Sequence, residues 1–377
     1  SPWKNGKGDI VKEVAEACRR GGIKFGIYLS PWDRHERTYG SPAYNDFFIG
    51  QLKELLTNYG EIFCVWFDGA CGEGPNGKKQ VYDWEKYYRV IRELQPNAVI
   101  SNCGPDVRWC GNEAGYTRAS EWSVVPAELQ DNEKIQELSQ KIDEREFSKR
   151  INIEDEDLGS REAIKHAKKL VWYPAEVNTS IRPGWFYHVS EDDKVKSLDE
   201  LLNIYYGSVG GNANFLLNLP PDRRGLIHEN DARRMKEFGE TIRHLFKENL
   251  AVHAKACASE TKDERHRADN LFDGNPETYW CPREGTEQAV IEIDLRAEKT
   301  FDHIVLAEPI RWGQRVESFL LEFKDGRDWR TLYRGTVIGY KRICRFEPVK
   351  SRFIRLSILE SRWCPALSSI SVFCGQM

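Results

Sequence analysis

The stretch Glu61-Ile-Phe-Cys-Val-Trp-Phe-Asp-Gly69 decides the fold of the first part of the chain. Its first seven residues form a mostly apolar run of strand length, which is typical of a strand buried on both faces of a parallel sheet. Catalytic groups of parallel α/β folds lie at the carboxyl ends of strands. Asp68 is therefore a candidate for chemistry, although aspartates that cap helices or form turns occupy the same position.

Helices and strands alternate around this run. Helical spacing of apolar residues predicts helices over 9–20, 43–59, 81–94 and 230–249. Short apolar runs predict strands over 23–29 and 97–102, the apolar runs resume at 170–173 and 185–188, and a last buried strand is predicted within 210–220. The charged segment 124–170 is interpreted as a solvent-exposed insertion with some helix. The alternation implies right-handed βαβ units and a parallel sheet.

The pattern changes after residue 250. Short alternating strands, separated by turn residues, are predicted at 289–295, 303–306, 319–323, 353–358 and 370–373. No run of helix length lies between them, which is typical of an antiparallel β-sandwich. Because 377 residues are too many for one ordinary core, we predict two domains, 1–250 and 251–377.

Composition excludes some classes of function. The formal net charge is −4, so no basic surplus is available to neutralise phosphates, and nucleic acid is not an expected partner. No apolar run reaches the ~20 residues that a membrane span needs. The 12 Trp and 15 Tyr residues fit carbohydrate binding, because aromatic rings stack on sugars, although a bulky core accounts for them equally well.

A nucleophilic Asp68 would need a second carboxyl group. In retaining glycosidases this group lies about 5 Å from the nucleophile and protonates the leaving oxygen. Three downstream glutamates have suitable settings: Glu73, Glu113 within Trp109-Cys-Gly-Asn-Glu-Ala-Gly115, and Glu121 within Ser120-Glu-Trp122. Reasoning from these residues alone does not rank the three.

Four motifs together resemble a known family. They are Ser1-Pro-Trp-Lys-Asn-Gly-Lys-Gly-Asp9, Phe25-Gly-Ile-Tyr-Leu-Ser-Pro-Trp-Asp33, Val65-Trp-Phe-Asp-Gly69 and Gly111-Asn-Glu113. In this order they resemble glycoside hydrolase family 29, the α-L-fucosidases, and most of all the branch that acts on α-1,3- and α-1,4-linked fucose. The resemblance, over residues 1–249, implies a (β/α) barrel with Asp68 as nucleophile and Glu113 as acid/base. It also implies double displacement with retention, without a metal or other cofactor.

The same resemblance implies sugar-binding positions and shows one departure. Tyr28, Trp32, Trp185 and Arg182 resemble family positions that stack on or bond to the sugar, although aromatic packing would explain Tyr28 and Trp32 as well. Family members carry two earlier barrel strands with a His-His-Asp-Gly type motif, which this sequence does not contain. We therefore expect the chain to begin inside the barrel and to expose a strand edge.

The second domain has a resemblance of its own. Ala268-Asp-Asn-Leu-Phe-Asp-Gly-Asn-Pro-Glu-Thr-Tyr-Trp280, Ser351-Arg-Phe-Ile-Arg-Leu356 and Ile370-Ser-Val-Phe373 resemble the discoidin, or factor 5/8 type C, module. A jelly-roll β-sandwich is implied, and many such modules bind sugars. Many also hold a structural Ca²⁺, for which Asp273, Asn275 and Thr278 offer oxygens. The acidic residue usual near the last strand is Ser369 here, which argues against calcium.

The sequence thus predicts an exo-acting α-L-fucosidase whose partners are fucosylated glycans. Family analogy places it outside the cytoplasm, in an extracellular or periplasmic setting. The alternative is a non-catalytic carbohydrate-binding or adhesion protein on a degenerate barrel. The pair of Asp68 and Glu113 favours the enzyme, because a pure binder has no need of both, whereas the missing histidine motif favours the binder.

Overall fold

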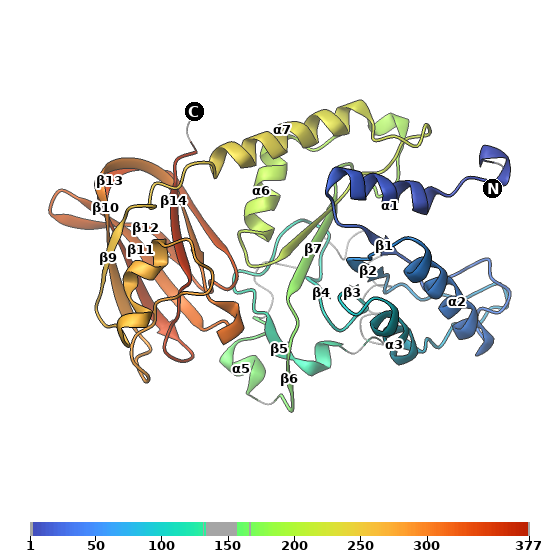
Figure 1. The fold of residues 1–377 in the computed structure, drawn as a ribbon, viewed down its shortest axis with the longest axis horizontal. Coiled ribbons are helices and arrows are strands. Elements are labelled where there is room, and N and C mark those ends of the chain that lie inside the picture. Colours follow the sequence, from blue (N-terminus) through green and yellow to red (C-terminus); the bar gives the residue numbers. More distant parts are fainter. Residues whose placement is uncertain (1–2, 131, 133–156, 166, 376–377) are drawn as a thin grey trace. The chain divides into compact units, whose positions relative to one another are not determined.

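A computed structural model describes residues 3–130, 132, 157–165 and 167–375 (Figure 1). The chain divides into two compact units. The first comprises residues 1–109, 127–150 and 171–173, and the second comprises residues 110–126, 151–170 and 174–377. Most of the predicted insertion at 124–170 lies outside the described residues. None of the helices in the described part of the chain is long and apolar enough to cross a membrane.

The first unit is built on a three-stranded parallel sheet. Its strands are β1 (Gly26–Tyr28), β2 (Cys64–Phe67) and β3 (Val99–Asn102), in the spatial order β1–β2–β3. The alternating helices are α1 (Ile10–Gly21), α2 (Ala43–Asn58) and α3 (Trp84–Leu94), as the apolar spacing predicts (Figure 1). β2 is therefore the central strand, and Asp68 follows its carboxyl end.

Local sequence explains these elements. The side chains of Asp9 and Asp83 cap α1 and α3 by accepting hydrogen bonds from the amides of Lys12 and Lys86. α2 buries residues at four-residue spacing against the sheet: Tyr44, Phe48, Leu52 and Leu56. β1 lies at the edge of its sheet, and the nearby Ile23 side chain is 68% exposed.

In the part of the second unit that precedes its C-terminal strands, the apolar runs predict only some of the strands and helices. β7 (Ala175–Ser180) is buried throughout and pairs in parallel with β8 (Asn214–Asn218). Because Glu176 and Asn178 are polar, β7 does not form the continuous apolar run from which a buried strand is predicted. The apolar run 185–188 lies in the loop that follows β7. α6 (Leu198–Ser208) was not predicted, although Ser197 and Glu200 form a capping box at its start. α7 (Glu229–Leu245) confirms the predicted amphipathic helix.

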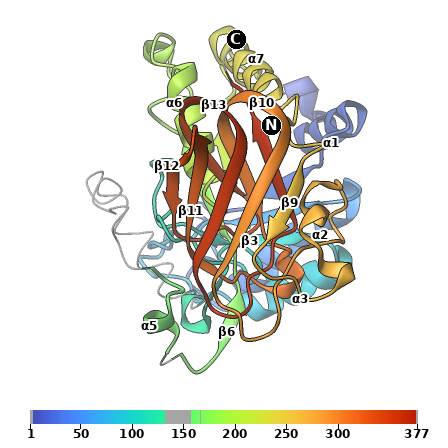
Figure 2. The same ribbon diagram turned by 90° about the vertical axis from the view of Figure 1, so that its left-hand side faces the viewer.

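The C-terminal part of the second unit is all β. Its strands are β9 (Lys255–Ala258), β10 (Ala289–Ala307), β11 (Val316–Asp325), β12 (Asp328–Gly335), β13 (Arg342–Ser361) and β14 (Ser369–Phe373). They are antiparallel in the order β12–β11–β13–β10–β14, and β9 pairs with β10 (Figure 2). The predicted strands 289–295 and 303–306 are the two halves of β10, which register shifts divide. This topology is consistent with a β-sandwich, and we call this part the C-terminal module (residues 255–375).

Candidate active site

Both carboxylate oxygens of Asp68 accept hydrogen bonds within the first unit. Tyr28 donates its hydroxyl to Oδ2 over 2.5 Å, and the amide of Ala70 donates to Oδ1 over 2.9 Å. Tyr28 ends β1 and Asp68 follows β2, so the parallel pairing of these strands brings the two side chains together. The carboxylate is held in one orientation at the edge where parallel folds place their chemistry.

Asn102 supports the same strand end, and the sequence analysis did not single it out. Its side-chain amide donates to the carbonyl of Phe67 over 2.8 Å, directly before Asp68. Asn102 has a φ of 65°, in the left-handed region that Asn tolerates better than most residues. The available signal was an asparagine at the end of the predicted strand 97–102.

Tyr28 is exposed over more than half of its surface and bonds Asp68 through its hydroxyl. Its side chain is 58% exposed and stacks on Trp66, with ring centroids 5.3 Å apart. Burial around the hydroxyl end, and then the charge of Asp68, raise the pKa of Tyr28 above its ordinary value. Tyr28 therefore stays protonated at neutral pH and keeps donating to the carboxylate.

Trp32 packs against the loop that follows Asp68. Its indole N–H donates to the carbonyl of Glu73 over 3.4 Å. A Cβ at Gly72 would lie 2.1 Å from Cζ2 of Trp32, so the ring can lie there only because residue 72 is glycine. The ring thus shapes the loop beside Asp68.

Glu113 lies in a tight loop of the second unit, which we call the Glu113 loop (residues 110–118). Gly111 and Gly115 have φ values of 101° and 97°, which side chains other than glycine rarely adopt. Asn112 closes the loop, because its side chain accepts from the amide of Ala114 and donates to the carbonyl of Tyr116. These turns place Glu113 at a half-buried position in the loop.

Trp185 contacts the Glu113 carboxylate directly. Its indole Nε1 donates to Oε2 of Glu113 over 3.2 Å. The carbonyl of Trp185 in turn accepts from the side chain of Asn218, at the end of β8, over 2.9 Å. Trp185 therefore positions the carboxylate from the carboxyl end of a parallel strand.

The two other candidate acids have different surroundings. Glu121 is 1% exposed and pairs with Arg118, with 3.5 Å between Oε2 and Nη1. Glu73 is exposed, and its backbone forms an antiparallel bridge with Lys79. A buried and paired carboxylate is poorly suited to give a proton to a substrate, so the surroundings favour Glu113.

Arg182 is enclosed by carboxylates. Its side chain is fully buried, Nε lies 2.8 Å from Oδ2 of Asp231 on α7, and Nη1 lies 2.9 Å from Oδ1 of Asp192. A guanidinium in this setting joins the end of β7 to α7. The arrangement favours a supporting role for Arg182 in place of the predicted contact with the sugar.

The possible calcium ligands in the C-terminal module bind one another. Asp273 Oδ1 accepts from the amide of Asn275, and Oδ2 accepts from the hydroxyl of Thr278. Calcium takes about six to eight oxygen ligands, usually with several carboxylates, and Asp273 is the one carboxylate among these three residues. Within the described residues, no group of three or more His, Cys, Asp or Glu side chains could hold a metal ion. These residues do not fit a calcium ion.

Comparisons with known proteins cover the whole chain. The α-L-fucosidase family model matches residues 3–244, and the F5/8 type C domain model matches residues 255–369. α-L-Fucosidase 1 of Arabidopsis thaliana is 39% identical over 381 residues, which cover 99% of this chain and 70% of the plant protein.

Solved structures agree with these matches. A protein from Bacteroides ovatus with a known crystal structure is 45% identical in sequence, with a TM-score of 0.83. The present chain covers 60% of the length of that protein. A Ruminococcus gnavus GH29 fucosidase in complex with fucose is 30% identical, with a TM-score of 0.81. That alignment covers 99% of this chain and 76% of the R. gnavus chain.

Proposed function

Because the chain belongs to the α-L-fucosidase family, glycoside hydrolase family 29, we propose that it releases terminal α-1,3- and α-1,4-linked L-fucose from glycans with retention of configuration. The observation that carries the proposal is the placement of Asp68. Asp68 directly follows the central parallel strand, and Tyr28 and Ala70 donate hydrogen bonds to its two carboxylate oxygens. The preference for these linkages and the stereochemical course rest on the motif resemblance.

In the proposed reaction the two carboxyl groups work in turn. Asp68 attacks the anomeric carbon of fucose, and the bond from that carbon to the leaving oxygen breaks as Glu113 gives that oxygen a proton. Glu113, now a carboxylate, then takes a proton from water. The water oxygen attacks the same carbon and breaks the fucosyl ester, which frees Asp68. Two inversions at one carbon give net retention.

The decisive experiment replaces the nucleophile. We expect Asp68→Ala to lower kcat on an aryl fucoside by roughly 10⁶-fold, the size of the loss when a serine hydrolase loses its nucleophile. Azide should restore part of the rate and yield the β-fucosyl azide, because it enters from the face that the carboxylate has left. NMR of the wild-type reaction should show α-fucose as the first product.

Asp46→Ala is the matched control. Asp46 lies on the same unit, and its carboxylate pairs with Lys86 at the surface, so activity should not change. Wild-type rates in Asp68→Ala would rule out this nucleophile. Binding of fucose by the wild-type protein without any turnover would instead identify the non-catalytic binder.

A further inference from the structure

The C-terminal module reaches into the segment that follows the Glu113 loop. Gln314, in the connection that leads into β11, is only 6% exposed. Its side-chain amide donates to the carbonyl of Glu121 over 3.1 Å, and its carbonyl accepts from the amide of Ser123 over 3.0 Å. One side chain of the module therefore satisfies two backbone groups of this segment, where water has little access.

Other contacts hold the same segment. Asn212 donates to the carbonyl of Glu121 over 2.9 Å and accepts from the amide of Tyr340 in the module over 2.7 Å. The hydroxyl of Thr336 donates to the carbonyl of Ala119 over 2.7 Å. The module thus holds the segment from more than one of its own loops.

Glu121 connects the segment held by the module to Cys110, the first residue of the Glu113 loop. Its buried carboxylate accepts from the amide of Arg118 over 3.1 Å and pairs with the Arg118 guanidinium. Nη1 of Arg118 donates to the carbonyl of Cys110 over 2.8 Å. Cys110 directly precedes the Gly-Asn-Glu motif, and its own amide donates to the carbonyl of Glu176 on β7.

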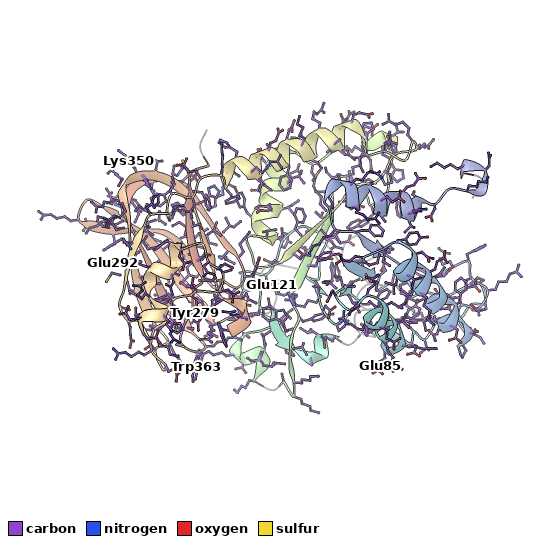
Figure 3. All side chains as sticks on the ribbon, in the orientation of Figure 1. Glu85, Glu121, Tyr279, Glu292, Lys350 and Trp363 are labelled. Atoms are coloured by element: carbon purple, nitrogen blue, oxygen red, sulfur yellow. The ribbon has the colours of Figure 1, made fainter. Side chains whose placement is uncertain are left out.

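These contacts form one continuous polar chain from Gln314 through Glu121 and Arg118 to Cys110. Figure 3 labels Glu121, whose carbonyl and carboxylate both take part. The buried charge of Glu121 keeps its arrangement only while it retains its partner, the partly buried Arg118, because an unpaired charge in the interior is costly. The chain of contacts is therefore well suited to fix the position of the loop.

We propose that Gln314 of the C-terminal module is a positioning residue for Glu113. The inference rests on the proposed function, in which Glu113 protonates the leaving oxygen. A displaced acid slows the bond-breaking step most where the leaving group needs a proton, and a misplacement of about 1 Å can cost about 100-fold in rate. The module then contributes to the chemical step through this contact, whether or not it binds sugar.

The test compares two substrates in the complete protein. Gln314→Met keeps the volume of the side chain and removes both hydrogen bonds. We expect its kcat on an unactivated fucosyl disaccharide to fall by about tenfold or more, and its kcat on an aryl fucoside with a good leaving group to fall less than about threefold. Thr336→Val, which removes a single partly exposed donor, should show the same bias in weaker form.

Reference variants separate the possible outcomes. Gln288 of the same module donates to the carbonyl of Leu359, away from this chain of contacts, so Gln288→Met should leave both rates unchanged. Glu113→Ala should show the strongest bias between the substrates. If Glu113→Ala shows the bias and Gln314→Met and Thr336→Val do not, the positioning role is wrong and the fucosidase proposal stands. If Glu113→Ala loses both activities equally, the proposed acid is wrong and the inference falls with it.

Discussion

At the scale of single residues, the candidate site is defined by which hydrogen bonds each carboxylate accepts. Asp68 is held by a tyrosine hydroxyl and a backbone amide, and Glu113 by an indole N–H. A hydrogen bond to a charged acceptor, as Asp68 is in the proposed reaction, contributes about 1.5–3 kcal/mol. Such contacts orient a carboxylate before a substrate arrives, which reduces the reorganisation that the reaction requires.

Tyr28→Phe tests this orientation. The variant keeps the ring that stacks on Trp66 and removes the hydroxyl that donates to Asp68. We expect kcat/KM on an aryl fucoside to fall by about 10- to 100-fold, the size of one lost hydrogen bond to a charged group. Steady-state kinetics of the wild type and of Tyr28→Phe measure this fall in kcat/KM.

Tyr59→Phe is the control for this prediction. The Tyr59 hydroxyl donates to Asp9 over 3.4 Å, a tyrosine–carboxylate contact elsewhere in the same unit. Its loss should leave kcat/KM unchanged. Equal effects of the two variants would mean that Tyr28 supports folding rather than the site.

At the scale of elements, Glu308 joins strand ends in the C-terminal module. It follows β10, and its fully buried carboxylate accepts from the amides of Arg315, Val316 and Gly339. Burial raises the pKa of Glu308 from its ordinary 4.5 to about 7, against the opposing effect of these amides. The connections around β11 and β13 therefore carry a group that titrates near neutral pH.

The raised pKa makes stability depend on pH with a definite sign. Between about pH 4.5 and 7 the folded protein keeps a proton that the unfolded chain has lost, so folding is favoured more at the lower pH. The contribution is complete below about pH 4.5 and is lost as the pH rises through about 7, in total about 3 kcal/mol. In urea unfolding, the free energy of unfolding of the wild type should fall relative to that of Glu308→Gln when the pH rises from 5 to 8.

The control is Glu292, an exposed residue of β10 (Figure 3). The free energy of unfolding of Glu292→Gln should differ from that of the wild type by the same amount at both pH values. A pH-independent difference for Glu308→Gln as well would show that Glu308 is ionised in the folded protein across this range.

At the scale of the whole molecule, the compact units do not coincide with the two family-model matches. The second unit contains the C-terminal module together with residues 110–126, 151–170 and 174–254. Buried contacts join these parts: Ile343 donates its amide to the carbonyl of Gly210, and Tyr206 of α6 contacts His303 of β10 over 2.9 Å. The module is therefore joined by contacts to the part of the second unit that precedes it.

We accordingly expect α6 and the module to open together. In native-state hydrogen exchange, amides of α6 and β13 should have opening free energies within about 1 kcal/mol of each other. Asn212→Ala should lower both, because it removes the contacts to Glu121 and Tyr340. Asn270→Ala, which removes contacts within the module alone, should lower protection in α6 and in β13 by similar amounts, because one opening exposes both. Opening of β13 well before α6 would contradict the prediction.

The sequence by itself determined the order of most helices and strands and the position of Asp68 after a buried strand. These features follow from local patterns, because apolar spacing and the turn residues around it act over a few neighbouring residues. The same analysis missed β7 and α6: polar residues in a buried strand break the apolar run, and a capping box is a weak signal alone. Motif resemblance selected Glu113.

The tertiary structure decided what surrounds each candidate. Trp185 reaches Glu113 across 72 residues of sequence, and Gln314 reaches the Glu121 carbonyl across 193. Arg182, which the motif resemblance predicted to bind sugar, lies buried against Asp231, 49 residues away. Partners this distant leave no local trace in a single sequence, since the folding of whole elements brings them together. The sequence therefore names the carboxylates, and the packing shows which side chains hold them in place.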